Sequence, residues 1–181
     1  MKTTYSIAPL MLLLPLLALS GCARLPAGVE PVTPFAAERY LGQWYEIARL
    51  DHRFERGLSQ VTAEYQQDSD GTIRVINRGC DGYNGEWQQA EGKARFVDGT
   101  DTGFLKVSFF GPFYGTYAVF ELDADYQHAF VSGPNHDYLW LLAREPEPSE
   151  PLRQRFVQRA GELGFPVEEL IWVKHGDSRC E

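Results

Sequence analysis

The chain has 181 residues, with 17 basic and 25 acidic side chains and a formal net charge of −8 at pH 7. This acidic balance disfavours nucleic acid as a partner, and it gives no overall attraction to an anionic lipid surface. Any contact with phospholipid must therefore be local or apolar.

Residues 1–21 have the pattern of a secretory signal. Lys2 is their only charge, and the apolar run from Ile7 to Leu19 is too short to span a bilayer. The run ends in Leu19-Ser20-Gly21-Cys22, which resembles the lipobox of bacterial lipoproteins. The resemblance implies cleavage before Cys22 and lipidation of its thiol, and the alternative is an ordinary signal followed by a buried or disulfide-bonded cysteine.

The expected anchor has consequences for location and charge. Three acyl chains on Cys22 would hold the protein to a membrane permanently. Ala23 after the cysteine resembles the default sorting signal for the outer membrane, which implies a lipid-anchored protein facing the periplasm. Cleavage would also remove Lys2 and leave 16 basic against 25 acidic residues, a net charge of about −9.

We expect residues 22–34 to form the lipidated N-terminus and a tether. Three prolines and few large apolar groups occur in this stretch. In an extended, polyproline-like form its 12 residues after Cys22 would reach roughly 37 Å. Residues 35–181 then form one domain of ordinary size for a single core.

Short runs rich in aromatic and β-branched residues recur through this domain, which is typical of an antiparallel sandwich or barrel. Turn-forming sequences separate them, for example Asp68-Ser69-Asp70-Gly71 and Gly133-Pro134-Asn135. The fold class predicted is all-β, an eight-stranded antiparallel up-and-down barrel. The eight predicted strands are approximately 43–50, 60–67, 72–78, 85–96, 103–110, 115–122, 127–132 and 138–144.

One C-terminal α-helix follows the strands. Ser149 is a suitable N-cap, Pro151 is tolerated in the first turn, and Gly164 suits the left-handed residue after the helix. The predicted eighth strand is apolar on both faces, so we expect the helix to pack outside the sheet against it. The helical stripe consists of Leu152, Phe156, Ala160 and Leu163, and residues 171–173 are a short final strand that could pair with the first.

Up-and-down topology assigns each loop to one end of the barrel. If the first strand runs from the floor to the rim, Gly42, Trp44, Asp125, Tyr126 and Arg144 all fall at the floor. Loops 51–59, 80–85, 110–115 and 133–137 then lie at the rim. The barrel interior of such a fold is just wide enough for one small ligand.

These floor residues resemble the motifs of the lipocalin family. The family's G-x-W motif appears as Gly42-Gln43-Trp44, its Asp-Tyr pair as Asp125-Tyr126, and its third-motif arginine as Arg144. The resemblance implies that Arg144 packs over the Trp44 ring in a structural cation–π contact. The stretches 40–58 and 107–115 further resemble the bacterial lipocalins of enterobacterial outer membranes.

Bacterial lipocalins are associated with fatty acids and lysophospholipids, so the resemblance implies such a ligand and a task in envelope lipid storage or transport. Strand alternation makes Phe109, Tyr117, Val119 and Trp140 candidates for the cavity wall, although each could instead face outward or fill a solid core. Arg53 and Arg56 in the first rim loop are candidates for a carboxylate or phosphodiester headgroup; a plain solvated loop is the alternative.

Two other residues near the ligand path leave alternatives open. Phe113 belongs to an apolar rim loop, 110–115, that could gate the ligand, contact a membrane or a second copy in a homodimer, or fold into the barrel mouth. Glu46 shares the inward parity of Trp44, so its carboxylate should be paired, for instance with an arginine, or neutral; the alternative is an outward tilt at the irregular start of the strand.

Cys80 and Cys180 are the two cysteines left after lipidation of Cys22, and an oxidising compartment favours a disulfide between them. Such a bridge would close a loop of about 100 residues and stabilise the fold by roughly 4 kcal/mol at most. The alternative is a free Cys80 thiol in a cavity enzyme, and a structural lipoprotein without ligand is a third reading.

Enzyme signatures are otherwise missing from the sequence. The four histidines have no metal-site spacing, and no G-x-S-x-G or G-x-G-x-x-G motif occurs. We therefore expect a binding protein with no catalytic residues, no metal and no cofactor.

Overall fold

The computed structural model describes residues 24–176 and Cys180, so the predicted signal and Cys22 lie outside the described residues. Eight antiparallel strands form a closed barrel, because β1 pairs with both β8 and β2. Each strand lies within three residues of its predicted bounds. The strands are β1 (Gly42–Arg49), β2 (Leu58–Gln67), β3 (Ile73–Asp81), β4 (Trp87–Phe96), β5 (Phe104–Phe110), β6 (Phe113–Leu122), β7 (His128–Ser132) and β8 (Leu139–Ala143).

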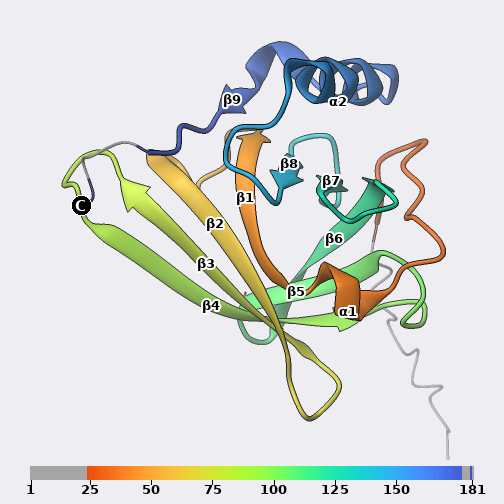
Figure 1. The fold of residues 1–181 in the computed structure, drawn as a ribbon. Helices are drawn as coiled ribbons and strands as arrows, with labels where there is room; N and C mark the ends of the chain where they lie inside the picture. The colour runs from red at the N-terminus through yellow and green to blue at the C-terminus, as the bar shows by residue number, and fades with distance from the viewer. Residues whose placement is uncertain (1–23, 177–179, 181) are drawn as a thin grey trace, which may run out of the picture.

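A helix covers one outer face of the barrel, as Figure 1 shows. This helix, α2 (Glu150–Glu162), buries Phe156 and Ala160 from the predicted stripe. Ser149 is its N-cap, but it caps through its backbone carbonyl, which accepts from Leu152 N at 3.1 Å, and not through its hydroxyl. After the 3₁₀ turn η1 (Val167–Glu169), the predicted short strand β9 (Ile171–Trp172) pairs with the end of β1.

Apolar residues form two layers, one inside the barrel and one between the sheet and α2. Strand β8 serves both layers, which explains why it is apolar on both faces. Trp140 and Leu142 belong to the interior, whereas Leu139, Leu141 and Ala143 pack with the helix. Among the described residues, no helix is both long and apolar enough to cross a membrane.

The segment before the barrel lies against it, although the sequence predicted an extended tether there. Val29 and Phe35 are only 5% and 4% exposed. The Val32 N–H donates to the Val119 carbonyl at 2.8 Å, and the Val32 carbonyl accepts from Gly103 N at 2.9 Å. Apolar side chains between the prolines thus find partners on the barrel. The segment leads into a short helix, α1 (Ala37–Tyr40), that the sequence analysis did not predict.

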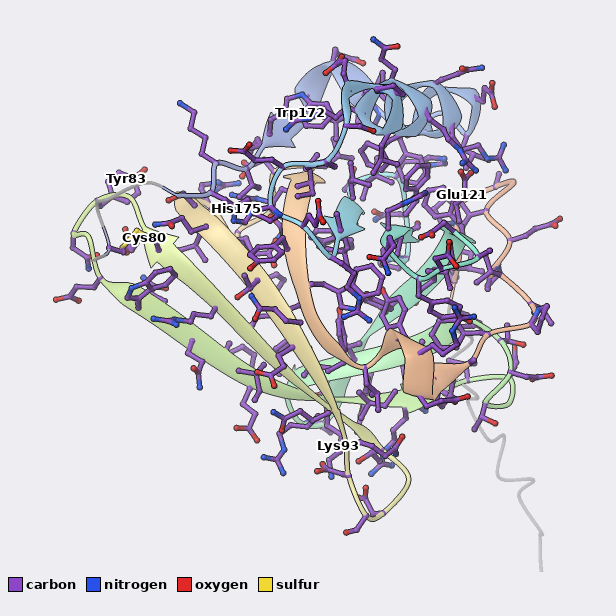
Figure 2. The ribbon with its side chains drawn as sticks, in the orientation of Figure 1. Cys80, Tyr83, Lys93, Glu121, Trp172 and His175 are labelled. Carbon is purple, nitrogen blue, oxygen red and sulfur yellow. A yellow bond between two sulfur atoms is a disulfide. The ribbon has the colours of Figure 1, made fainter. Side chains whose placement is uncertain are left out.

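The C-terminal tail is fastened to the rim by the predicted disulfide. Cys80 at the end of β3 is bonded to Cys180. Figure 2 shows Cys80 beside Tyr83 at the outer end of the β3–β4 hairpin. The Trp87 indole N–H donates to the Cys180 carbonyl at 2.7 Å, and the guanidinium carbon of Arg78 lies 3.9 Å from the Trp87 ring centroid.

Candidate functional site

The floor of the barrel is closed by Arg144 and Trp44. The guanidinium carbon lies 3.9 Å from the Trp44 ring centroid. Arg144 also donates to the backbone carbonyls of Gln43 and Leu41, at 2.7 and 2.8 Å. Gly42 has φ +89°, a conformation in which any side chain is strained.

Both residues of the second predicted motif lie in the β6–β7 turn at the floor, but only Tyr126 is buried there. Tyr126 is buried, and its hydroxyl accepts from Ala36 N at 2.8 Å. Asp125 is exposed, and the carboxylate that organises the turn belongs to Asp123, which accepts from the backbone N–H groups of Asp125, Gln127 and His128. The Asp side chain that acts here is therefore two residues earlier than the motif indicated.

Packing inside the barrel changes from floor to rim. Near the floor the inward residues Trp44, Tyr65, Ala94 and Val119 are buried, which makes this half solid. Nearer the rim the inward residues keep part of their surface accessible: Ala63, Asn77, Val107, Phe109, Tyr117 and Trp140. The interior is thus closely packed below and more accessible above, and the upper part, lined by these six residues, is called the chamber.

The chamber is accessible along β4. This strand pairs with β5 only from Lys93 to Phe96, so its first half extends past the β5–β6 hairpin, as Figure 1 shows. Gln88 and Ala90 share the inward parity of Ala94, yet both are exposed. Solvent therefore reaches the inner face of upper β4.

The structure places the four predicted wall residues on the inner face. Phe109, Tyr117 and Trp140 belong to the partly accessible upper interior, whereas Val119 lies in the closely packed part below. Phe113 lies at the rim with 78% of its surface exposed, next to Phe110 at 72%. Their contact with a ligand stays a prediction.

A buried ion pair lies beneath the first rim loop. Arg49 Nη1 lies 2.7 Å from Glu46 Oε1, and both residues are almost completely buried. The pairing of β1 with β8 shifts by one residue between Glu46 and Ala48, so Ile47 and Ala48 both face the helix. This β-bulge places Glu46 and Arg49 on the same inner face although they are three residues apart.

Arg49 also holds the rim loop in place. Its Nη2 donates to the carbonyls of Glu55 and Leu58 at 2.8 and 3.1 Å. The Glu55 carboxylate accepts from the Trp140 indole at 3.2 Å and lies 3.0 Å from His52 Nε2. Loop 50–57 is therefore fastened to the barrel by a cluster of charged and aromatic side chains: Glu46, Arg49, His52, Glu55 and Trp140.

Burial and charge shift the two carboxyl groups of this cluster in opposite directions. Burial, reinforced by nearby Glu55, raises the pKa of Glu46 well above its ordinary value despite the opposing effect of Arg49. Burial would also raise the pKa of Glu55, but hydrogen bonds and the charge of His52 outweigh it and lower the pKa. The sequence left open whether Glu46 is paired with an arginine or neutral. In the structure Glu46 is paired with Arg49, and its raised pKa also makes it easily protonated.

Neither predicted headgroup arginine lies in the chamber. The Arg53 guanidinium lies over the ring of exposed Phe54, at 4.9 Å from its centroid. Arg56 is exposed and pairs with Asp51 at 2.8 Å. The buried cation is Arg49, which sequence reasoning missed because strict alternation from Trp44 would point it outward.

Three tyrosines form a second polar group, at the boundary between the closely packed part and the chamber. The Tyr117 hydroxyl lies 2.7 Å from that of Tyr40 and 2.8 Å from that of Tyr65. Burial is the main cause that raises the pKa of all three. Only Tyr117 was predicted to face inward, and no local signal could have joined residues so far apart in the chain.

No metal centre is found in the part of the chain that the structure describes, where no group of three His, Cys, Asp or Glu residues could hold an ion. The only described cysteines, Cys80 and Cys180, form a disulfide, so neither offers a thiol. The arrangement is therefore suited to holding an apolar molecule with polar groups at two levels.

Comparisons with known proteins agree with this geometry. The family model described as a lipocalin-like domain matches residues 35–175. The Outer membrane lipoprotein Blc of Vibrio cholerae is 57% identical over 157 residues, covering 86% of this chain and 92% of that protein. The Escherichia coli protein of the same name is 50% identical over 177 residues, covering 93% and 100%. Insecticyanin from Manduca sexta has a similar fold, with a TM-score of 0.68 at 20% identity over 88% of this chain and 90% of that one.

Proposed function

This chain belongs to the lipocalin family, and we propose that it binds one fatty acid or lysophospholipid inside the barrel. Lipocalins with this architecture bind lipids or other small molecules. The observation that supports the proposal is the accessibility of the upper interior, where inward apolar residues such as Val107, Phe109 and Trp140 are only partly buried.

The energetics suit an acyl chain. Burying 16 carbons gains on the order of 12 kcal/mol gross at about 0.8 kcal/mol per methylene. The costs of association and ordering cancel much of this, which leaves micromolar or tighter affinity. An acyl chain entering beside the exposed inner face of upper β4 would lie along Phe109 and Trp140.

Location in the outer membrane follows from the relatives and the sequence together. Proteins at 50–57% identity over most of this chain are named outer membrane lipoproteins. The chain is accordingly a lipid-anchored protein of the outer membrane. Lipidation of Cys22, and storage or transport of lipid for envelope maintenance, are part of the proposal.

For one of the two predicted headgroup arginines, a lipid headgroup would compete with a carboxylate of the protein. Arg56 already has a carboxylate partner in Asp51, so a lipid phosphate or carboxylate would have to displace it. Within residues 24–176 and Cys180, Arg53 pairs with no carboxylate and is the better of the two candidates. A rim contact for the headgroup is therefore proposed through Arg53 more than Arg56.

We do not propose catalysis. The thiol mechanism needs a free Cys80, and this residue is bonded to Cys180. A binding protein is expected to release its ligand unchanged, which product analysis after prolonged incubation would check.

Fluorescence titration tests the proposal. Palmitate and a palmitoyl lysophospholipid added to the mature chain carrying Cys22→Ser should quench Trp140 with a one-to-one end point, and Trp140→Phe should remove most of the signal. Val107→Phe, which fills the chamber, should weaken binding about tenfold. Lys106→Phe on the outer face of the same strand is the matched control. If both variants bind like the parent, the chamber is not the site.

A further inference from the structure

The three tyrosine hydroxyls inside the barrel carry three hydrogens but make only two contacts with one another, so one hydrogen has no acceptor among them. Tyr40, Tyr65 and Tyr117 come from α1, β2 and β6, and the Tyr117 oxygen contacts both of the others. Their raised pKa keeps all three protonated at neutral pH. Each phenol donates one hydrogen, and two contacts consume only two of the three.

The surplus hydrogen can reside on any of the three oxygens, depending on the direction of the two hydrogen bonds. Within residues 24–176 and Cys180, no further side-chain or backbone acceptor is recorded for these hydroxyls. When Tyr40 and Tyr65 both donate to Tyr117, the free O–H belongs to Tyr117. Buried donors are rarely left without an acceptor, so the count points to a ligand or a water at this place.

Tyr117 is the most accessible residue of the three tyrosines. Tyr40 and Tyr65 are only 3% and 6% exposed, whereas Tyr117 is partly accessible although it faces inward. On its own strand, Gly115 is the next inward residue toward the rim, and on β5 the inward Val107 and Phe109 continue the wall. When the surplus hydrogen is on Tyr117, the free O–H is therefore at the lower end of the chamber.

The surrounding charges favour an uncharged acceptor over an anion. Glu46 and Glu55 lie on the rim side, and their charge contributes to the raised pKa of Tyr65. Arg144 acts in the opposite direction, but its guanidinium is held on the floor against Trp44 and the backbone. A carboxylate at Tyr117 would thus pass the two acidic side chains and meet no cation free to pair with it.

We propose that the Tyr117 hydroxyl is a binding site for an uncharged oxygen acceptor of a lipid, such as a carbonyl or a hydroxyl, which enters the chamber polar end first. The inference rests on the proposed function, because it assumes that the chamber holds an aliphatic chain. It reverses the orientation in which a headgroup stays at the rim. The aliphatic tail would then extend toward the rim, where Phe110 and Phe113 are exposed.

A pair of ligands with the same carbon skeleton tests the proposal. 2-Tridecanone and tridecane differ in one carbonyl oxygen, and their affinities are measured by competition with a bound fluorescent fatty acid on the mature chain carrying Cys22→Ser. The quantity measured for each variant is the ratio of the two dissociation constants. The two ligands differ in hydration by the same amount for every variant, so this difference cancels when the ratios are compared. Tyr117→Phe should reduce the preference for the ketone about tenfold, which corresponds to ~1.4 kcal/mol.

Tyr65→Phe is the matched control. It leaves two hydroxyls with one contact, so a free hydrogen can still be on Tyr117 and the preference for the ketone should persist. Because Tyr117→Phe leaves Tyr40 and Tyr65 unpaired, the triple variant in which all three become Phe serves if the single variant does not fold. It should show the same loss.

The outcomes separate this inference from the proposed function. If the ratio is the same in the parent and in Tyr117→Phe, or if Tyr65→Phe lowers it equally, the Tyr117 site is refuted while binding in the chamber stands. If the fluorescent fatty acid does not bind to the folded protein, the proposed function itself fails, and this inference fails with it. If the probe binds but neither ligand displaces it, only the Tyr117 site is refuted.

Discussion

Replacing Arg144 by Met should destabilise the barrel by about 3 kcal/mol. The side chain covers Trp44 and donates to four backbone carbonyls, those of Arg39, Leu41, Gln43 and Tyr126. Met keeps an unbranched apolar stem over the ring, so the change removes mainly the charge and the hydrogen bonds.

The magnitude follows from the burial of each contact. The cation–π contact contributes about 1 kcal/mol. The bonds to Leu41 and Tyr126 are partly buried and contribute about 1 kcal/mol each. The bonds to Gln43 and Arg39 are exposed, so water replaces them at little cost. Arg144→Lys keeps the charge but loses the planar fork, and should cost about 2 kcal/mol.

Urea unfolding followed by far-ultraviolet circular dichroism measures these changes. Arg95→Met is the control, because Arg95 is exposed on β4, and it should change the free energy of unfolding by less than 0.5 kcal/mol, as is usual at the surface. A loss below about 1 kcal/mol for Arg144→Met, or one equal to that of Arg95→Met, would refute the view that this arginine closes the floor.

Three further predictions concern other parts of the fold. Changing Cys80 and Cys180 to Ser should lower the free energy of unfolding by up to roughly 4 kcal/mol, and reductant should then have no further effect; a variant as stable as the oxidised parent contradicts this. Phe35→Ala should cost about 3–4 kcal/mol in the same assay, because Phe35 is 4% exposed, and a cost below 1 kcal/mol would mean that the N-terminal segment is not docked. Because the pKa of Glu46 is raised above its ordinary 4.5, its contribution to stability is complete below pH 4.5 and is lost as pH rises through the folded-state value. The free energy of unfolding of the parent should therefore fall with rising pH relative to that of Glu46→Gln, whereas parallel pH profiles would show that Glu46 is not the titrating group.

The strands could be predicted because their signals are local. Alternating apolar residues and turn sequences placed all eight strands, and the positions of Gly42, Trp44 and Arg144 in that frame placed them together at the floor. Topology alone connects these residues, since adjacent antiparallel strands bring every second turn to the same end. The disulfide was predictable from the compartment and from the even number of remaining cysteines.

The polar groups inside the barrel were not predictable in the same way. Arg49 faces inward only because a bulge inserts one residue between Glu46 and Ala48, and nothing in the local sequence distinguishes this strand from a regular one. Residues 24–34 looked like a linker by composition, yet Val29 and Val32 have places on the barrel that depend on residues 103 and 119 and on the α2 side of the sheet.

The sequence by itself determined the closed barrel, its direction and the outer helix, because periodicity, turn chemistry and the floor motif act over a few residues each. Only the tertiary structure decided what the chamber contains. Tyr40, Tyr65 and Tyr117 meet because α1, β2 and β6 converge at one level of the barrel. The unpaired hydroxyl hydrogen arises only where these three side chains come together, so the sequence of a single strand cannot reveal it.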